Sequence, residues 1–193
     1  MKISACLLLV LFVLSVDAPA QNVELSGGWA HISGDGGLDG YNVGVAAWFA
    51  PKASIAFDFD RAWDNSRLGV FELTSTGVIL SKSRIQNFLA GPRFFFPGLI
   101  KSKQKNLALL TPFAEGQLGV SYLRSSLEDH TRNVSQFASD NAFSWMIGGG
   151  ADYRFSSHWL GRVKVGLLRT HLADSGQSRL RFSLGIVYTF KER

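Results

Sequence analysis

Ten charged residues share a feature that points to paired ionic chemistry. Each falls on the polar side of a segment in which polar and apolar residues alternate. The set comprises five acids and five bases: Glu24, Asp58, Asp60, Glu115, Asp152, Arg93, Arg154, Arg162, Lys164 and Arg181. If that side faces an interior, the charges must pair, because an isolated buried charge is very costly. The pattern predicts an internal network of ion pairs.

Four arginines lie on the opposite, apolar side, each near one end of its segment: Arg61, Arg84, Arg124 and Arg169. An arginine on a lipid-facing strand is costly at mid-depth and nearly free at the membrane interface. Its planar guanidinium also fits phosphate oxygens. Two interpretations remain open: these side chains contact phosphates of lipopolysaccharide, or they mark the water boundary.

Other polar motifs carry weaker signals. His31 and Ser33 have the His-x-Ser spacing found in some lipid A-modifying barrels, but a nucleophile and its base need a third positioned group, and the sequence indicates no acid partner. Asp35 and Asp39 supply too few oxygens to predict a calcium site. The remaining histidines show no metal-ligand spacing, and the basic residues form no single stripe of the kind that binds nucleic acid. We therefore expect no catalytic residues, no cofactor, no metal and no nucleic-acid partner.

The elements that must position these residues are strands, since apolar residues recur at every second position. The clearest alternation is the last, where Leu180, Phe182, Leu184, Ile186, Tyr188 and Phe190 are all large and apolar. Seven earlier segments lie near residues 23–29, 41–49, 55–60, 85–96, 109–123, 142–154 and 160–170. Eight segments of about 9–13 residues have the length at which a tilted strand crosses a bilayer, and an even number returns both termini to one side.

The first twenty residues have the layout of a secretory signal peptide. Lys2 supplies the positive charge, Leu7 to Val16 is almost wholly apolar, and Ala18-Pro19-Ala20 is a small-x-small cleavage site. Cleavage would remove Cys6, the only cysteine, and leave residues 21–193 as one domain with a net charge of +5. No later stretch is long and apolar enough for a membrane-spanning helix, so a place in the bilayer would require a closed barrel.

Glycines decide which side of the segments faces inward. Eight of them lie on the polar side: Gly28, Gly44, Gly91, Gly119, Gly148, Gly150, Gly166 and Gly185. Small residues suit a narrow lumen, whereas on a solvated surface they only weaken a strand. The pattern favours a membrane barrel over the alternative, a soluble β-sandwich or lipocalin-like barrel with its apolar side inward.

Several stretches resemble the small outer-membrane β-barrel superfamily of OmpA-type and Opa-type proteins. They are FLAGPRFFF, TPFAEGQLGVSYL, the segment from Ala142 to Tyr153, and the closing RFSLGIVYTF. The resemblance implies an all-β, eight-stranded antiparallel up-and-down transmembrane barrel in a Gram-negative outer membrane. The apolar residues of the last strand, Phe182, Leu184, Ile186, Tyr188 and Phe190, also resemble the signal recognised by the barrel-assembly machinery, although three charged residues follow Phe190.

This architecture favours a structural and surface-interaction role. The interior of an eight-stranded barrel is just wide enough for side chains to fill it, so we expect the lumen to be plugged. The longest external connections, residues 64–84 and 124–140, are candidates for adhesion or ligand contact, and the apolar stretch from Leu68 to Leu80 predicts that the first extends as a hairpin. The alternatives are a passive porin-like channel for small solutes, a lumen network that acts as a proton or ion path or as a gate, and, remotely, a lipid A-modifying enzyme.

Overall fold

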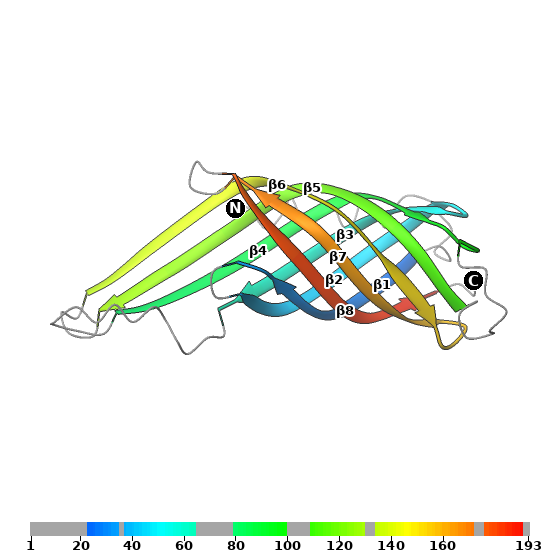
Figure 1. The fold of residues 1–193 in the computed structure, drawn as a ribbon, viewed down its shortest axis with the longest axis horizontal. Coiled ribbons are helices and arrows are strands. Elements are labelled where there is room, and N and C mark those ends of the chain that lie inside the picture. Colours follow the sequence, from blue (N-terminus) through cyan, green and yellow to red (C-terminus); the bar gives the residue numbers. More distant parts are fainter. Residues whose placement is uncertain are drawn as a thin grey trace.

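In the computed structural model, eight antiparallel strands form one closed barrel (Figure 1). The structure describes residues 23–34, 37–64, 79–99, 109–129, 134–171 and 176–190, so the predicted signal peptide lies outside the described residues. The strands are β1 (Val23–Ile32), β2 (Leu38–Ala50), β3 (Ala53–Trp63), β4 (Ile79–Phe95), β5 (Leu110–Asp129), β6 (Val134–Arg154), β7 (Trp159–Thr170) and β8 (Gln177–Thr189).

Each strand pairs with its neighbours in the chain, and the pairing of β1 with β8 closes the barrel. This is the predicted up-and-down topology, and the fold prediction is confirmed. The chain passes from β2 to β3, from β4 to β5 and from β6 to β7 at one end of the barrel, which also holds the start of β1 and the end of β8 and which we call the turn end. The other four connections join strands at the opposite end, the loop end. The described residues include no helix of the length and hydropathy needed to cross a membrane.

The two sides of the barrel wall differ in chemistry as the alternation predicts. Large apolar side chains point outward, and those of Leu118, Ile147 and Leu184 are more than half exposed. The inward side holds buried acids and bases instead. This is the inverse of the arrangement expected for a soluble sandwich or lipocalin-like barrel, and it means that the outer surface needs an apolar surrounding.

Two inward glycines are required by the close approach of neighbouring strands. A Cβ placed on Gly119 would lie 1.8 Å from the carbonyl oxygen of Phe88, and one on Gly28 would lie 2.2 Å from that of Leu184. No side chain fits at either position without moving backbone. These glycines therefore shape the wall rather than merely leave space in the lumen.

Three adjacent strands continue beyond the others at the loop end (Figure 1). β4, β5 and β6 contain 17, 20 and 21 residues, against 10–13 in the other five. We call residues 79–83, 125–129 and 134–142 the protruding sheet. The register of β5 with β6 runs without interruption from Leu110↔Tyr153 to Asp129↔Val134.

The protruding sheet corrects the prediction of a long loop at 124–140. Within that range, residues 124–129 and 134–140 are paired strand, and only 130–133 lie outside the described residues. Of the other predicted loop, 64–84, residues 79–84 belong to β4, while 65–78 lie outside the described residues. The predicted hairpin from Leu68 to Leu80 thus falls mostly outside them. The error at 124–140 arose because the polar–apolar alternation used to find the strands does not continue through these residues.

Candidate functional site

The lumen holds a buried ionic network centred on Glu24 of β1. Glu24 Oε1 accepts hydrogen bonds from Arg93 Nη1 at 2.9 Å and from Arg162 Nη1 at 2.7 Å. Arg93 and Arg162 lie on β4 and β7, so this carboxylate joins distant parts of the wall across the lumen. All three residues are at most 3% exposed. One carboxylate between two guanidiniums leaves an excess positive charge, so further acids are needed nearby to neutralise it. The structure contains them.

Each of the two arginines has a second acidic partner. Arg162 forms a two-point contact with Asp152 on β6, with Nε–Oδ1 at 2.6 Å and Nη2–Oδ2 at 2.7 Å. Arg93 donates from Nε to Glu115 Oε2 on β5 at 2.8 Å. Parallel double bonds of this kind fix the geometry of a guanidinium as well as neutralising it. The network therefore links five strands.

Asp58 on β3 extends the network toward the middle of the barrel. Its Oδ2 accepts from Lys164 Nζ at 2.8 Å and from Gln117 Nε2 at 2.7 Å, and it lies 3.5 Å from Arg93 Nη2. Gln117 was placed on the polar side by the sequence, but its role as a neutral member of the network was not predicted. Its amide gives the Asp58 carboxylate a hydrogen-bond donor without adding another positive charge.

Two aromatic residues complete this layer and were not predicted as members. The Phe113 ring lies 5.1 Å from the guanidinium carbon of Arg93 and 5.2 Å from that of Arg162, within cation–π range of both. Trp48 donates from Nε1 to Glu24 Oε2 at 3.2 Å. Both occupy positions on the polar side of their segments. A bulky aromatic residue at such a position is the sequence signal that could have identified them as members of the network.

The remaining predicted members are placed differently. Arg181 on β8 donates from Nη2 to Asp60 Oδ1 on β3, a buried pair nearer the loop end. Arg154 is half-buried at the turn-end terminus of β6. The structure thus brings seven of the ten residues into one chain of contacts, two into a separate pair, and leaves Arg154 at the margin.

Nearer the loop end, apolar residues occupy much of the inward side, beside the Asp60–Arg181 pair and the hydrogen-bonded Asn87, Ser121 and Ser144. A cluster of buried side chains, which we call the apolar layer, comprises Ile32, Leu38, Ala62, Ile85, Leu89, Met146 and Leu168, with Leu123 and Ala142 packed against it. The sequence predicted inward charges and glycines and did not predict this apolar layer. Ile85, Leu89, Met146 and Leu168 share the parity of the polar residues, so the reversal was visible in the sequence.

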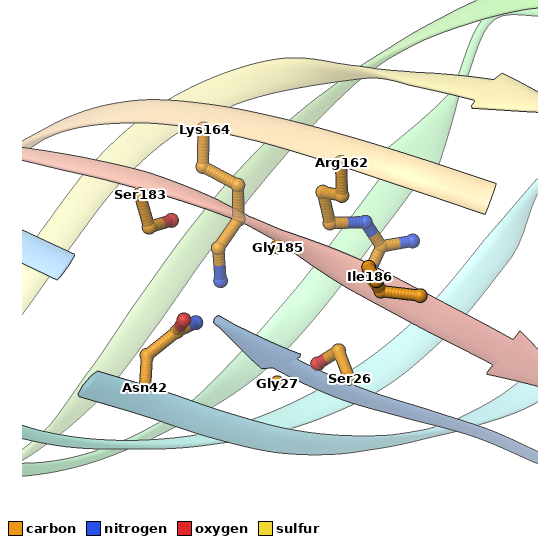
Figure 2. A pocket seen from close by; sticks show the side chains of 8 residues that line it. All are labelled: Ser26, Gly27, Asn42, Arg162, Lys164, Ser183, Gly185 and Ile186. Carbon is orange, nitrogen blue, oxygen red and sulfur yellow. The ribbon is translucent and has the colours of Figure 1, made fainter. Parts of the chain in front are cut away.

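A small polar cavity lies beside the network, behind the β1–β8 seam. Figure 2 shows Lys164 and Asn42 pointing toward the same space from opposite walls, with Ser26 and Ser183 beside them. The cavity has room for about one water molecule. Its lining of hydroxyl, amide and ammonium groups suits water, not an organic substrate.

The four outward arginines do not form a ring. Arg84 on β4 lies directly opposite Arg124 on β5, and both are exposed. Arg61 on β3 is paired with Gln86, which places it diagonally from Arg84. Arg169 is apart from them on β7, where its guanidinium lies beside Gly176. Three of the four thus form one patch, the β3–β5 arginine patch.

The His-x-Ser motif has an acid partner that the sequence did not indicate. His31 Nδ1 lies 2.9 Å from Asp39 Oδ1 on the neighbouring strand β2. Ser33 is directed the other way, since its Oγ accepts from the Leu180 backbone N–H of β8 at 2.8 Å. The other edge of the imidazole ring faces Gly37, on the β2 side. Base and hydroxyl are therefore held on opposite sides of β1, an arrangement unsuited to nucleophilic catalysis.

Metal binding finds no support in the part of the chain that the structure describes. No group of three or more histidine, cysteine or acidic side chains there is arranged to hold an ion. The lumen acids are engaged with arginine and lysine, which leaves their oxygens unavailable as a ligand set.

Comparison with known proteins supplies structural relatives but no close sequence relatives. No protein-family model and no curated protein matches the sequence. Among solved structures, the attachment invasion locus protein Ail of Yersinia pestis superposes with a TM-score of 0.57 at 16% identity, covering 87% of this chain and 98% of Ail.

Two further solved structures have the same fold. A major outer membrane protein from Thermus thermophilus gives a TM-score of 0.62 at 13% identity, with 86% of this chain and 98% of that one covered. The outer membrane protein OprG from Pseudomonas aeruginosa gives 0.52 at 13% identity, with 89% and 96% covered. At these identities the comparison establishes the fold. The chain has the closed eight-stranded architecture of the small outer-membrane β-barrel proteins, the superfamily that its sequence resembles.

Proposed function

We propose that this protein is a non-enzymatic integral barrel of the outer membrane, with a closed lumen, that acts at the cell surface through its protruding sheet. The observation that carries this proposal is the combination of a filled lumen with three strands that extend beyond the barrel wall. A barrel without a pore needs another reason to span the membrane, and a rigid sheet held above the surface provides one.

The outer surface supports the membrane location. Outward aromatic side chains, including those of Trp29, Tyr41, Trp63 and Tyr122, lie toward the loop end, and those of Tyr153, Trp159 and Tyr188 lie toward the turn end. Such girdles flank the apolar band of barrels in lipid. Export would use residues 1–20 as the signal peptide, and assembly would use the outward side chains of β8 that end at Phe190.

Two successive barriers support a closed lumen. The ionic network crosses the barrel toward the turn end, and the apolar layer packs across it toward the loop end. An ion would have to displace buried pairs and then pass the apolar layer, where only a few buried polar groups such as Asn87, Ser121 and Ser144 could replace its hydration shell. This arrangement disfavours the passive channel and the proton path.

The β3–β5 arginine patch supports contact with lipopolysaccharide. Like charges directly opposite one another destabilise a strand pair, so Arg84 and Arg124 would gain from an anion between them. Their position near the aromatic residues of the loop end is where lipid phosphates lie. Arg169 lies outside this patch and is expected to contribute less to lipopolysaccharide binding.

The experiment that tests the surface role shortens the protruding sheet without touching the barrel. Replacing residues 127–136 by Asn-Gly joins Ser126 to Phe137, which already face each other, through a favourable two-residue turn. The full chain and the shortened chain are expressed in a Gram-negative host and compared for attachment to cultured cells, to immobilised heparin and to other bacteria. Heparin is included because Ail was solved with a heparin analogue.

We expect the shortened chain to keep heat-modifiable migration, the sign of a folded barrel, and to lose any attachment that the full chain confers. Equal attachment by the two chains, or none by the full chain, contradicts the surface role. Purified full chain in planar bilayers should give little current, and a steady open-pore conductance would instead establish the channel.

A further inference from the structure

The small polar cavity surrounds a buried amide that has no protein partner. Asn42 on β2 is 5% exposed, and its side chain forms no hydrogen bond with any residue that the structure describes. Figure 2 shows this amide and the Lys164 ammonium of β7 pointing into the cavity from opposite walls, with the hydroxyl groups of Ser26 and Ser183 beside them. A buried amide without a partner is costly. Its position here therefore indicates a small polar ligand.

The chemistry of the cavity selects water as that ligand. The space has room for about one water molecule. Its two cations, Lys164 and Arg162, already pair with acids of the network, so this lining offers a small ion no unneutralised charge. The Lys164 ammonium carries three hydrogens and donates one of them to Asp58. One water can accept a second and donate to the Asn42 amide oxygen or to a serine hydroxyl.

A second group of unpartnered atoms lies next to Asn42, on β3 and β4. Asp60 directly faces Asn42 on one side and Asn87 on the other. Its Oδ1 accepts from Arg181, whereas its Oδ2 is buried and has no hydrogen-bond partner among the described residues. Asn87 Oδ1 accepts from Ser121 Oγ on β5 at 2.6 Å, which leaves Asn87 Nδ2 directed away from β5 and likewise unpartnered. A free acceptor and a free donor thus lie on facing residues of neighbouring strands.

One water fits between Asp60 and Asn87. Residues directly opposite each other on antiparallel strands have Cβ atoms about 4.5–5.5 Å apart. A water at that spacing can accept from Asn87 Nδ2 and donate to Asp60 Oδ2. Such a water commonly links complementary polar groups that lie beyond direct hydrogen-bonding distance. The Arg162–Asp152 pair needs none, because both carboxylate oxygens are bonded directly.

We infer that the closed lumen binds two structural waters. One joins Lys164 to Asn42. The other joins Asp60 to Asn87. Because Asn42 faces Asp60 directly, the two sites are neighbours, and the waters connect the seven-residue ionic network to the Asp60–Arg181 pair, which the protein contacts alone leave separate. The sites do not depend on the proposed function, but slow exchange of their water does, since it rests on the two barriers that close the lumen.

The test compares buried N–H groups that differ in whether they have a protein partner. The amides of Asn42 and Asn87 are predicted to contact water. Arg93 Nε is the control, because it is similarly buried, does not line the cavity and donates to Glu115 at 2.8 Å. The full mature chain is isotopically labelled and placed in lipid nanodiscs. Nuclear magnetic resonance then measures magnetisation transfer from water to each group.

Two substitutions of Ser183 form a matched pair. Ser183→Val replaces the hydroxyl group by two methyl groups that fill the cavity, whereas Ser183→Ala removes the hydroxyl group and leaves the space. We expect the native chain to show transfer to both amides and little to Arg93. Ser183→Val should reduce transfer to Asn42 to the level of Arg93 and leave transfer to Asn87, while Ser183→Ala should retain both. Folding of each variant is checked by heat-modifiable migration.

Several outcomes overturn the inference. No transfer to either amide of the native chain removes both sites, and equal transfer to Arg93 indicates general hydration of the lumen. Transfer to Asn42 that survives Ser183→Val excludes the cavity as its source. Transfer to Asn42 alone excludes the connection to Asp60.

A failure of the proposed closed lumen would look different. If both waters are present but exchange with bulk water as fast in the native chain as in a variant with Leu89→Ser and Leu168→Ser, the sites stand and the apolar barrier fails. If neither amide shows transfer and planar-bilayer conductance stays low, the sites are excluded and the closed lumen stands.

Discussion

Arg162 and Asp152 face each other across the β6–β7 pairing and share two hydrogen bonds, of 2.6 and 2.7 Å. Neighbouring strands thus supply both partners of the tightest pair in the lumen network. Arg162 also reaches Glu24 on β1, so the same guanidinium ties this strand pair to the far wall. Loss of Arg162 would leave the buried Asp152 without its arginine and would leave Glu24 with Arg93 as its arginine partner.

The first prediction follows from that relationship. Arg162→Met should lower the free energy of unfolding by about 3–5 kcal/mol, the usual cost of removing one partner from a buried ion pair. Asp152→Asn should lower the free energy of unfolding by less, because Arg162 keeps its ion pair with Glu24. Urea unfolding of the purified barrel in lipid vesicles measures both, with the exposed Lys52→Met as the control. Equal effects of Arg162→Met and Lys52→Met would mean that the network does not stabilise the fold.

The second prediction separates the two barriers in the lumen. Arg93→Ala should leave planar-bilayer conductance low, because the apolar layer still closes the loop-end half. Combining it with Leu89→Ser and Leu168→Ser should raise the conductance, because water can then enter both halves. A large current from Arg93→Ala alone would show that the apolar layer is no barrier.

A third prediction concerns two glycines on β5. Gly119→Ala should impair folding, since the new Cβ would lie 1.8 Å from the Phe88 carbonyl oxygen. The cost should reach at least the range of about 1–3 kcal/mol that is typical of overpacking. Gly116→Ala is the matched control, three residues away on the outward side, with no atom within 4 Å of its added Cβ. Indistinguishable heat-modifiable migration and unfolding curves for the two variants would contradict the close strand approach.

A fourth prediction concerns the β3–β5 arginine patch. Arg84→Glu with Arg124→Glu should lower barrel stability in vesicles that contain lipopolysaccharide and have little effect in vesicles of zwitterionic phospholipid. Arg169→Glu, outside the patch, should have a smaller effect in both. If charge reversal changes stability equally in the two membranes, the arginines mark the water boundary only.

The barrel could be predicted from the sequence because an apolar outer surface around a filled lumen imposes a simple rule on its strands. Each outward residue, such as Leu118 or Ile147, must be apolar, while its neighbours inside need not be, so every crossing strand carries the same period. The rule applies only within the closed wall. Residues 134–139 continue β6 beyond that wall, their sequence shows no such alternation, and they were therefore mistaken for loop.

The lumen was harder to predict than the wall. Parity showed which charges point inward, but the partner of Glu24 could be found only from the closed barrel, because Arg93 and Arg162 lie 69 and 138 residues away in the chain. The apolar layer was overlooked because single residues such as Met146 interrupt an otherwise polar side. His31 and Asp39 likewise meet only through the β1–β2 register.

The uninterrupted β5–β6 ladder has a mechanical consequence. Its twenty paired positions connect the tip at Asp129 and Val134 to the base of the barrel at Leu110 and Tyr153 without a bulge that could act as a hinge. A pull on the tip therefore loads many backbone hydrogen bonds in shear at the same time, instead of breaking them one after another. Under the proposed surface role, an attachment made at this tip should therefore hold against flow until the barrel wall itself unfolds.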